Sequence, residues 1–146
     1  MKIIQLNEIT DIEILAGIAR EEGFGFLDRL VREWADGTNR FDKEGEALFG
    51  AMVGDRLLGT AGLTYQSEGI GRVRRVYVHP EVRRQGVGEL LARAVLEKAK
   101  EHFSTVVLFT DNPAAATFYE ALGFKREDFT SPYRSSHRFD LRESNH

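Results

Sequence analysis

The sequence VYVHPEVRRQGVG, residues 76–88, decides the fold of this chain. An apolar strand runs into Pro80, a basic turn follows, and two glycines open a long amphipathic helix over about residues 88–102. Glycines keep side chains away from the backbone, and the free N–H groups at the start of a helix attract anions. The stretch therefore predicts a phosphate cradle, with Arg83 and Arg84 adding positive charge at its mouth.

The same two glycines, Gly86 and Gly88, also fit a tight strand-to-helix turn that binds nothing. Two well-known nucleotide motifs do not match. Leu91 stands where Gly-x-Gly-x-x-Gly requires its third glycine, and the Gly-Lys-Ser/Thr of a P-loop is missing. The choice between a plain turn and an anion cradle therefore depends on the rest of the chain.

The composition is typical of a globular protein and predicts one domain over residues 1–146, with 42% hydrophobic and 29% charged residues. The absence of cysteine excludes disulfides, thiolate metal sites and a cysteine nucleophile. The net charge of −3 argues against general nucleic-acid binding, and no apolar run is long enough to span a membrane. With no signal peptide predicted, we expect a cytoplasmic protein.

Positive charge is concentrated around the predicted cradle, although the chain as a whole is acidic. Between residues 72 and 93, six arginines stand against two glutamates. They are Arg72, Arg74, Arg75, Arg83, Arg84 and Arg93, with Glu81 and Glu89. A solvated charged face would also explain the pattern. The arginines flank the cradle, however, which favours a small polyanionic ligand at the helix start.

The segments before the cradle are predicted from their hydrophobic spacing. We expect strands at 2–6, 48–52, 57–65 and 70–79, and helices at 10–22 and 27–36. Thr10-x-x-Glu13 predicts a capping box, and Gly54-Asp55 predicts a hairpin turn. The apolar link 24–26 between the helices fits either the core or the lip of a pocket, and we favour the core.

The segments after the cradle complete the predicted fold. A nearly all-apolar strand is expected at 106–110, and Asn112 should cap a helix that has Pro113 at its first position and ends at Gly123. Two further strands are expected at 125–129 and 134–141. The order predicts an α/β (α+β) fold, with four helices flanking a mixed twisted sheet of about six to seven strands.

The sequence resembles the GNAT superfamily of N-acetyltransferases in two motifs. Residues 83–88, RRQGVG, match Arg/Gln-x-x-Gly-x-Gly/Ala after the strand that ends at His79-Pro80. Asn112, the small residues 114–116 and FYEALGF at 118–124 match the second motif. The resemblance covers nearly the whole chain in element order. It implies an N-acetyltransferase in which an amine attacks acetyl-CoA directly through a tetrahedral intermediate. A non-catalytic acetyl-CoA sensor is the alternative.

The resemblance also implies where acetyl-CoA binds. The amides from Arg84 to Gly88 would hold the pyrophosphate, with Glu89 continuing the turn. Strand 76–78 would splay from strand 106–110, and the pantetheine arm would pair with the backbone exposed in the gap. The side chain of Asn112 would bind a pantetheine amide. The implied cofactor-binding residues are Val76, Tyr77, Val78, Arg83, Arg84, Gln85, Gly86, Val87, Gly88, Glu89, Asn112 and Tyr119.

Two catalytic residues follow from the same resemblance. The Val78 N–H would stabilise the oxyanion, and the Tyr119 phenol would protonate the departing thiolate. Tyr119 could otherwise be a buried aromatic of a short helix. Arg74 and Arg75 occupy the strand positions where several family members carry a glutamate base. The substitute bases that remain open are His79, Tyr65, Glu21 and Glu22.

By resemblance, the acceptor pocket is built by the first two helices, the strand after them and the final hairpin. Its aromatic candidates are Phe24, Phe26, Trp34, Phe41, Tyr65 and Tyr133. Arg75 could face this pocket and pair with a carboxylate of the acceptor. The final hairpin could pair between two subunits of a homodimer. The expected partner is thus an amine, with no metal, nucleic acid or membrane.

Overall fold

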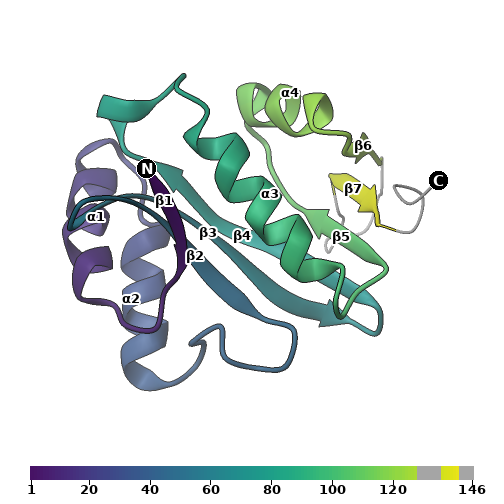
Figure 1. Cartoon of the computed structure of the whole chain (residues 1–146), viewed down its shortest axis with the longest axis horizontal. Helices are drawn as coiled ribbons and strands as arrows, with labels where there is room; N and C mark the ends of the chain where they lie inside the picture. Colours follow the sequence, from purple (N-terminus) through teal and green to yellow (C-terminus); the bar gives the residue numbers. More distant parts are fainter. Residues whose placement is uncertain (128–135, 142–146) are drawn as a thin grey trace.

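The computed structural model describes residues 1–127 and 136–141, through which a single mixed sheet runs in the order β1-β2-β3-β4-β5-β7-β6 (Figure 1). Its strands are β1 Lys2–Gln5, β2 Ala47–Val53, β3 Arg56–Ser67, β4 Ile70–Val78, β5 Thr105–Leu108, β6 Lys125–Arg126 and β7 His137–Asp140. The helices are α1 Thr10–Glu21, α2 Phe26–Asp36, α3 Val87–Ala99 and α4 Pro113–Ala121, with a 3-10 turn η1 Pro80–Val82. β4 and β5 are parallel, and the other neighbouring strands are antiparallel. The predicted fold class is confirmed.

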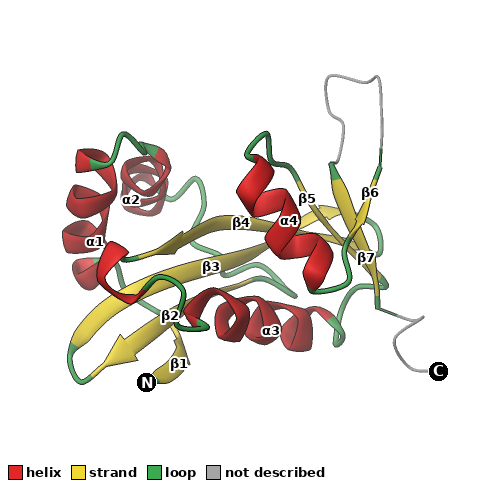
Figure 2. Ribbon diagram, turned by 90° about the horizontal axis from the view of Figure 1, so that it is seen from above, coloured by secondary structure: helices red, strands yellow, loops and turns green. Residues whose placement is uncertain are grey.

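Helices cover both faces of the sheet, with α1 and α2 on one side and α3 on the other (Figure 2). The core is accordingly divided in two. Val87, Leu91 and Val95 of α3 pack with Tyr119 of α4 against one face of the sheet, and Leu15 and Leu27 of α1 and α2 pack against the other. Each helix buries one apolar stripe, which is the spacing that the sequence predicts.

Helix boundaries follow local capping, with two departures from prediction. The predicted capping box is wrong. It requires Thr10 as the N-cap, but Thr10 is the first residue of α1, Ile9 is the N-cap, and no side chain caps the helix. Helix α3 ends at Ala99 rather than near residue 102. Gly37 ends α2 in the left-handed conformation, with φ 80°, which glycine adopts without strain.

The parallel pairing between β4 and β5 is short, and a gap forms in the sheet where the pairing ends. Pairing runs only from Ile70 with Thr105 to Arg72 with Val107, yet β4 continues to Val78. The two strands therefore diverge beyond Arg72, and backbone groups of β4 on that side lose their strand partner. The splayed strand pair expected from the resemblance is present.

A bulge in β4 accompanies the divergence. The register between β3 and β4 shifts between Thr60 and Gly62, and Arg75 has φ 57°, in the left-handed region. The Thr60 hydroxyl, fully buried, donates to the Arg75 carbonyl at 2.8 Å and so fixes the bulge. A one-residue bulge reverses which face each later side chain occupies. Val73 packs on the α3 side, whereas Tyr77, four residues later, packs on the α1–α2 side.

The C-terminal hairpin is only partly described. β6 and β7 are shorter than the predicted strands 125–129 and 134–141, and residues 128–135 and 142–146 lie outside the described residues. Pairing of this hairpin between subunits therefore stays a prediction. In the described part of the chain, no helix has the length and apolar character needed to cross a membrane.

Candidate active site

A cavity of about 710 Å³ lies where β4 and β5 diverge. Its walls come from β4, from the segment after β5, from α4 and from the link between α1 and α2. The lining residues are Phe24, Phe26, Arg72, Val73, Arg74, Arg75, Val76, Tyr77, Val78, Arg83, Leu108, Phe109, Thr110, Asp111, Asn112, Ala114, Ala115 and Tyr119. The fold thus brings β4 and the two motif segments at Arg83 and 112–119 to one hollow.

The loop before α3 presents unpaired backbone amides. Arg84 and Gly86 both have positive φ, 66° and 83°, so the chain curls tightly before the helix. Leu90 is the first residue whose N–H bonds back, to the Gly86 carbonyl at 3.1 Å. Among the described residues, no hydrogen-bond partner exists for the amides of residues 84–89. A Cβ at Gly86 would meet no atom within 4 Å, which leaves open space above these amides. This geometry suits an anion.

Val78 turns its backbone toward the gap between β4 and β5. His79 donates its N–H to Leu58 of β3 at 2.8 Å, and Val78 lies opposite Gly59. Backbone groups alternate in direction along an antiparallel strand, so the Val78 N–H and C=O point away from β3. The carbonyl accepts from Arg83 Nε at 3.0 Å, which leaves the N–H for a ligand.

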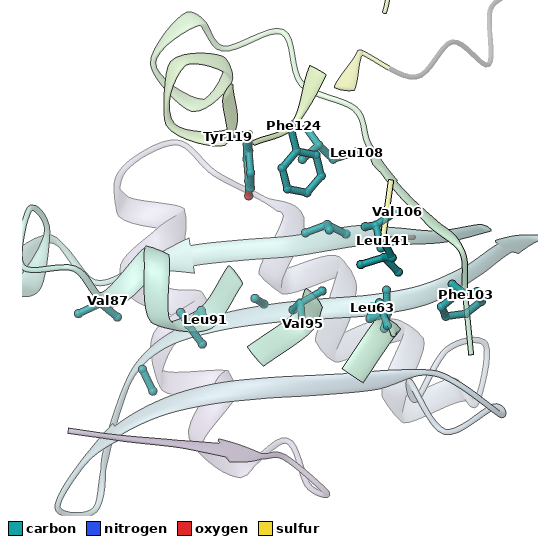
Figure 3. Packing of buried hydrophobic residues seen from close by; sticks show 14 residues of the cluster. Leu63, Val87, Leu91, Val95, Phe103, Val106, Leu108, Tyr119, Phe124 and Leu141 are labelled. Atoms are coloured by element: carbon teal, nitrogen blue, oxygen red, sulfur yellow. The ribbon is translucent and has the colours of Figure 1, made fainter. Parts of the chain in front are cut away.

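Tyr119 extends from α4 toward the sheet, with its hydroxyl at the far end of the buried ring (Figure 3). Its ring packs at 5.0 Å from Phe118 and 5.4 Å from Phe124, measured between centroids. Burial raises the pKa of the phenol to about 12, so the hydroxyl is protonated at neutral pH. It has no hydrogen-bond partner among the described residues and lines the cavity. A buried, protonated and unpartnered phenol is suited to donate a proton.

Asn112 caps α4 as predicted. Its Oδ1 accepts from the amides of Ala114 at 2.9 Å and Ala115 at 3.3 Å, and Pro113 takes the first helical position. The side-chain NH₂ group of Asn112 is left over on the cavity wall. Capping therefore uses only the oxygen of this side chain, and its NH₂ group stays available to a ligand.

Arg83 does not serve the cradle in the way that the sequence predicts. Its guanidinium makes two bonds to Glu22 at the end of α1, at 2.6 and 2.8 Å, and stacks 5.6 Å from the Tyr77 ring. The Tyr77 hydroxyl also donates to Glu22. The hydrogen bond from Arg83 is the main cause that holds the pKa of Glu22 below its ordinary value. Glu22 is therefore a poor base, and its role is to tie α1 to β4.

The other predicted bases lie in unsuitable places. His79 is buried, and its Nδ1 accepts from the Glu81 amide at 3.0 Å, so it stabilises the turn η1. Tyr65 is 54% exposed and lies outside the cavity. Glu21 is exposed at the end of α1. Asp111 is the one carboxylate among the lining residues in the described part of the chain, and sequence reasoning missed it.

Only part of the predicted acceptor pocket comes together. Phe24, which is 41% exposed, and Phe26 line the cavity, and Phe26 also packs against the α1–α2 core, so the interpretation of their link as core holds for Phe26 and is wrong for Phe24. Phe41 is buried against Gly62. A Cβ added at Gly62 would lie only 2.4 Å from the Phe41 ring, so the ring fills this space. Trp34 packs with the α1–α2 core, and Tyr133 lies outside the described residues.

The family model described as the acetyltransferase (GNAT) family matches residues 12–124, most of the chain. The chain belongs to the GNAT family. Membership implies acyl-CoA-dependent N-acetyl transfer. No match exists among curated proteins.

Solved structures agree with the GNAT assignment. A protein from Exiguobacterium sp. 255-15, provisionally assigned as an acetyltransferase, has a TM-score of 0.83 at 28% identity over 99% of this chain and 98% of that one. A GNAT-family acetyltransferase from Staphylococcus aureus Mu50 gives 0.71 at 19%, covering 96% and 98%. The ribosomal-protein-S18-alanine N-acetyltransferase from Escherichia coli gives 0.68 at 19%, covering 94% and 88%. The last two are similar in fold alone.

Proposed function

We propose that this GNAT protein transfers an acetyl group from acetyl-CoA to a primary amine of a small molecule, amino acid or peptide. One observation carries the proposal: the backbone of Val78 and the phenol of Tyr119 border one gap between β4 and β5, and the unpaired amides before α3 adjoin its Val78 end, where a Cβ at Gly88 would lie 3.8 Å from the Val78 side chain. An anion site at one end and a proton donor at the other match the two ends of an acyl-CoA thioester.

The cofactor would lie along this gap. The amides from Arg84 to Gly88 would hold the pyrophosphate, with the Glu89 amide completing the turn. Arg84 and Gln85 supply the amides through their backbone, since Gln85 Nε2 is turned back toward the Glu81 carbonyl at 3.3 Å. The pantetheine arm would pass Val76 and Val78 of β4, where β5 has diverged and no longer pairs with the backbone.

The chemistry would use two groups of the chain. The Val78 N–H would stabilise the oxyanion of the tetrahedral intermediate, a contribution of about 3 kcal/mol in comparable oxyanion holes. The Tyr119 hydroxyl would give its proton to the departing thiolate as the C–S bond breaks, and its raised pKa keeps the proton on the phenol until that step. Arg75 stands in place of a base, so the amine would enter unprotonated or lose its proton to water.

The alternative is a GNAT module that senses acetyl-CoA without turnover. The arginines at 74 and 75, in the place of a glutamate base, favour it. Both functions require acetyl-CoA binding, so binding alone does not separate them. Release of CoA in proportion to an added amine separates them.

The test combines calorimetry with a thiol assay. We expect acetyl-CoA and CoA to bind, and free thiol to appear only when an acceptor amine is added. The protein contains no cysteine, so every thiol detected comes from CoA. If neither form of the carrier binds, the proposed function is wrong. If both bind and no amine in a broad panel releases thiol, the sensor is the better description.

Substitutions of Asn112 can separate its two uses. In Asn112→Asp the carboxylate still caps α4, but the NH₂ donor to the pantetheine is lost. We expect an unchanged Tm and a KM for acetyl-CoA raised about two- to tenfold, the usual worth of one hydrogen bond. Asn112→Ala should raise KM and also destabilise the fold by about 1 kcal/mol. An Asp variant with the wild-type KM would restrict Asn112 to capping.

A further inference from the structure

The cavity is strongly cationic on the side away from the cradle. Arg72, Arg74 and Arg75 line it, and the Nε atoms of all three are buried without a hydrogen-bond partner among the described residues. Buried hydrogen-bond donors of charged groups are normally paired, because burial removes their hydration and an unpaired donor gains no hydrogen bond to offset that cost. Three arginines in one wall, of which only Arg75 has a carboxylate partner among the described residues, therefore favour an anionic ligand.

The bulge explains why the three arginines gather. Before the bulge, Arg72 and Arg74 lie on the face opposite Val73, which packs on the α3 side. The bulge then allows Arg75, although adjacent to Arg74, to reach Glu33 of α2 on the same face. The arginines thus share the face covered by α1 and α2, whereas the cradle opens at α3 on the other face.

Only one of the three has a carboxylate partner in the described part of the chain. Arg75 pairs with Glu33 at 3.2 Å, and its side chain is only 9% exposed. Arg72 instead lies over the Phe109 ring, with the guanidinium carbon 4.5 Å from the centroid. Burial, followed by the charges of Arg74 and Arg75, lowers the pKa of Arg72 to about 10. No carboxylate of residues 1–127 or 136–141 forms an ion pair with Arg72 or Arg74.

The phosphate cradle lies toward the other end of β4 from these arginines. Arg72 and Arg74 precede Val78 by six and four residues along β4, and the bulge at Arg75 lies between. The cradle lies beyond Val78. Arg72 and Arg74 also border a second hollow of about 210 Å³ between β4 and the segment after α2. Its two carboxylates are occupied: Glu33 binds Arg75, and Glu46 accepts from the amides of Lys43 and Tyr65.

We propose that the acceptor is an amine that also carries an oxyanion, a carboxylate or a phosphate monoester, bound by Arg72 and Arg74 on the α2 side of β4. The inference rests on the proposed acetyl transfer and specifies its substrate class. A guanidinium matches the geometry of either oxyanion with two parallel hydrogen bonds. Phe24, Phe26 and Phe109 would contact the apolar part of the acceptor, and its amine would face the Val78 end.

The first test compares matched acceptors with the wild-type protein. Amino acids are set against their C-terminal amides, and phosphoethanolamine against ethanolamine, with KM from CoA release and Kd from calorimetry on the CoA complex. We expect the anionic member of one pair to bind about ten- to hundredfold more tightly than its neutral partner. Which pair shows the difference identifies the oxyanion. Equal KM and Kd within both pairs would overturn the proposal.

The second test uses variants. Arg74→Gln and Arg72→Gln should raise the KM of the anionic acceptor about tenfold or more, and leave that of its neutral partner unchanged. The control is Arg32→Gln, an exposed position of α2 outside the cavity. The Kd of acetyl-CoA should be unchanged in every variant, which also shows that each has folded. A loss of acetyl-CoA affinity in the Arg72 and Arg74 variants would assign these arginines to the cofactor instead.

Failure of the two proposals can be distinguished. If anionic amines bind the CoA complex selectively and are not acetylated, the proposed activity is wrong and the oxyanion site stands. If amines are acetylated with no preference for an anionic group, the activity stands and the oxyanion site is wrong.

Discussion

Replacing Tyr119 with phenylalanine is expected to lower kcat by about a hundredfold or more, with little change in the affinity for acetyl-CoA. The substitution removes one oxygen from a ring that is held between Phe118 and Phe124. Packing should therefore survive, while the departing thiolate loses its proton donor. Steady-state kinetics at saturating substrates, together with calorimetry, measure the two effects separately.

Two controls make this result specific to proton donation. Tyr77→Phe removes a hydroxyl from the same cavity, but that hydroxyl donates to Glu22, so kcat should fall far less. An acetyl aryl thioester, whose thiolate leaves without protonation, should reduce the difference between wild type and Tyr119→Phe. An unchanged kcat in Tyr119→Phe would remove Tyr119 from the mechanism and make it a packing residue.

A single negative charge at Gly86 should abolish most of the affinity for acetyl-CoA. Gly86 has φ 83° and open space where its side chain would begin, and Asn and Asp tolerate this conformation better than other residues. In Gly86→Asp, a carboxylate about 6 Å from a bound phosphate would cost roughly 3 kcal/mol at an effective dielectric constant of about 20. We therefore expect Kd to rise about a hundredfold, as measured by calorimetry at low salt.

Gly86→Asn is the matched control, because it has nearly the same shape without the charge. Its Kd should rise only slightly, and added salt should reduce the difference between the two variants. The Asp variant should melt no lower than the Asn variant, since an acidic N-cap stabilises the start of α3. Equal affinities in the two variants would mean that the anion binds elsewhere.

The sequence was informative wherever the signal is local. Hydrophobic spacing and turn residues predicted the element order, and α4 starts as Asn112-Pro113 predicts, because capping depends on neighbouring atoms only. The Glu89–Arg93 pair at 3.1 Å on α3 is another local consequence of helical spacing. The two motifs at 83–88 and 112–124 were sufficient for the family.

The sequence was least informative where residues far apart meet. Arg83 reads as part of the cradle, yet it bonds to Glu22, 61 residues earlier, and neither residue carries a signal for the other. The apolar character of Phe24 predicts a core position, yet its side chain is 41% exposed and lines the cavity. The arginines of β4 read as a charged strand, and no pattern marks the bulge at Arg75.

The sequence by itself determined the family, the helix that opens after Gly86 and the identity of the groups that could do chemistry, since each depends on residue type and short-range spacing. Only the tertiary structure decided which side chains share the cavity. A bulge, held by one hydroxyl from the neighbouring strand, reverses the alternation of β4. Faces and partners across a sheet are set by register between distant segments, and register is a property of the assembled sheet.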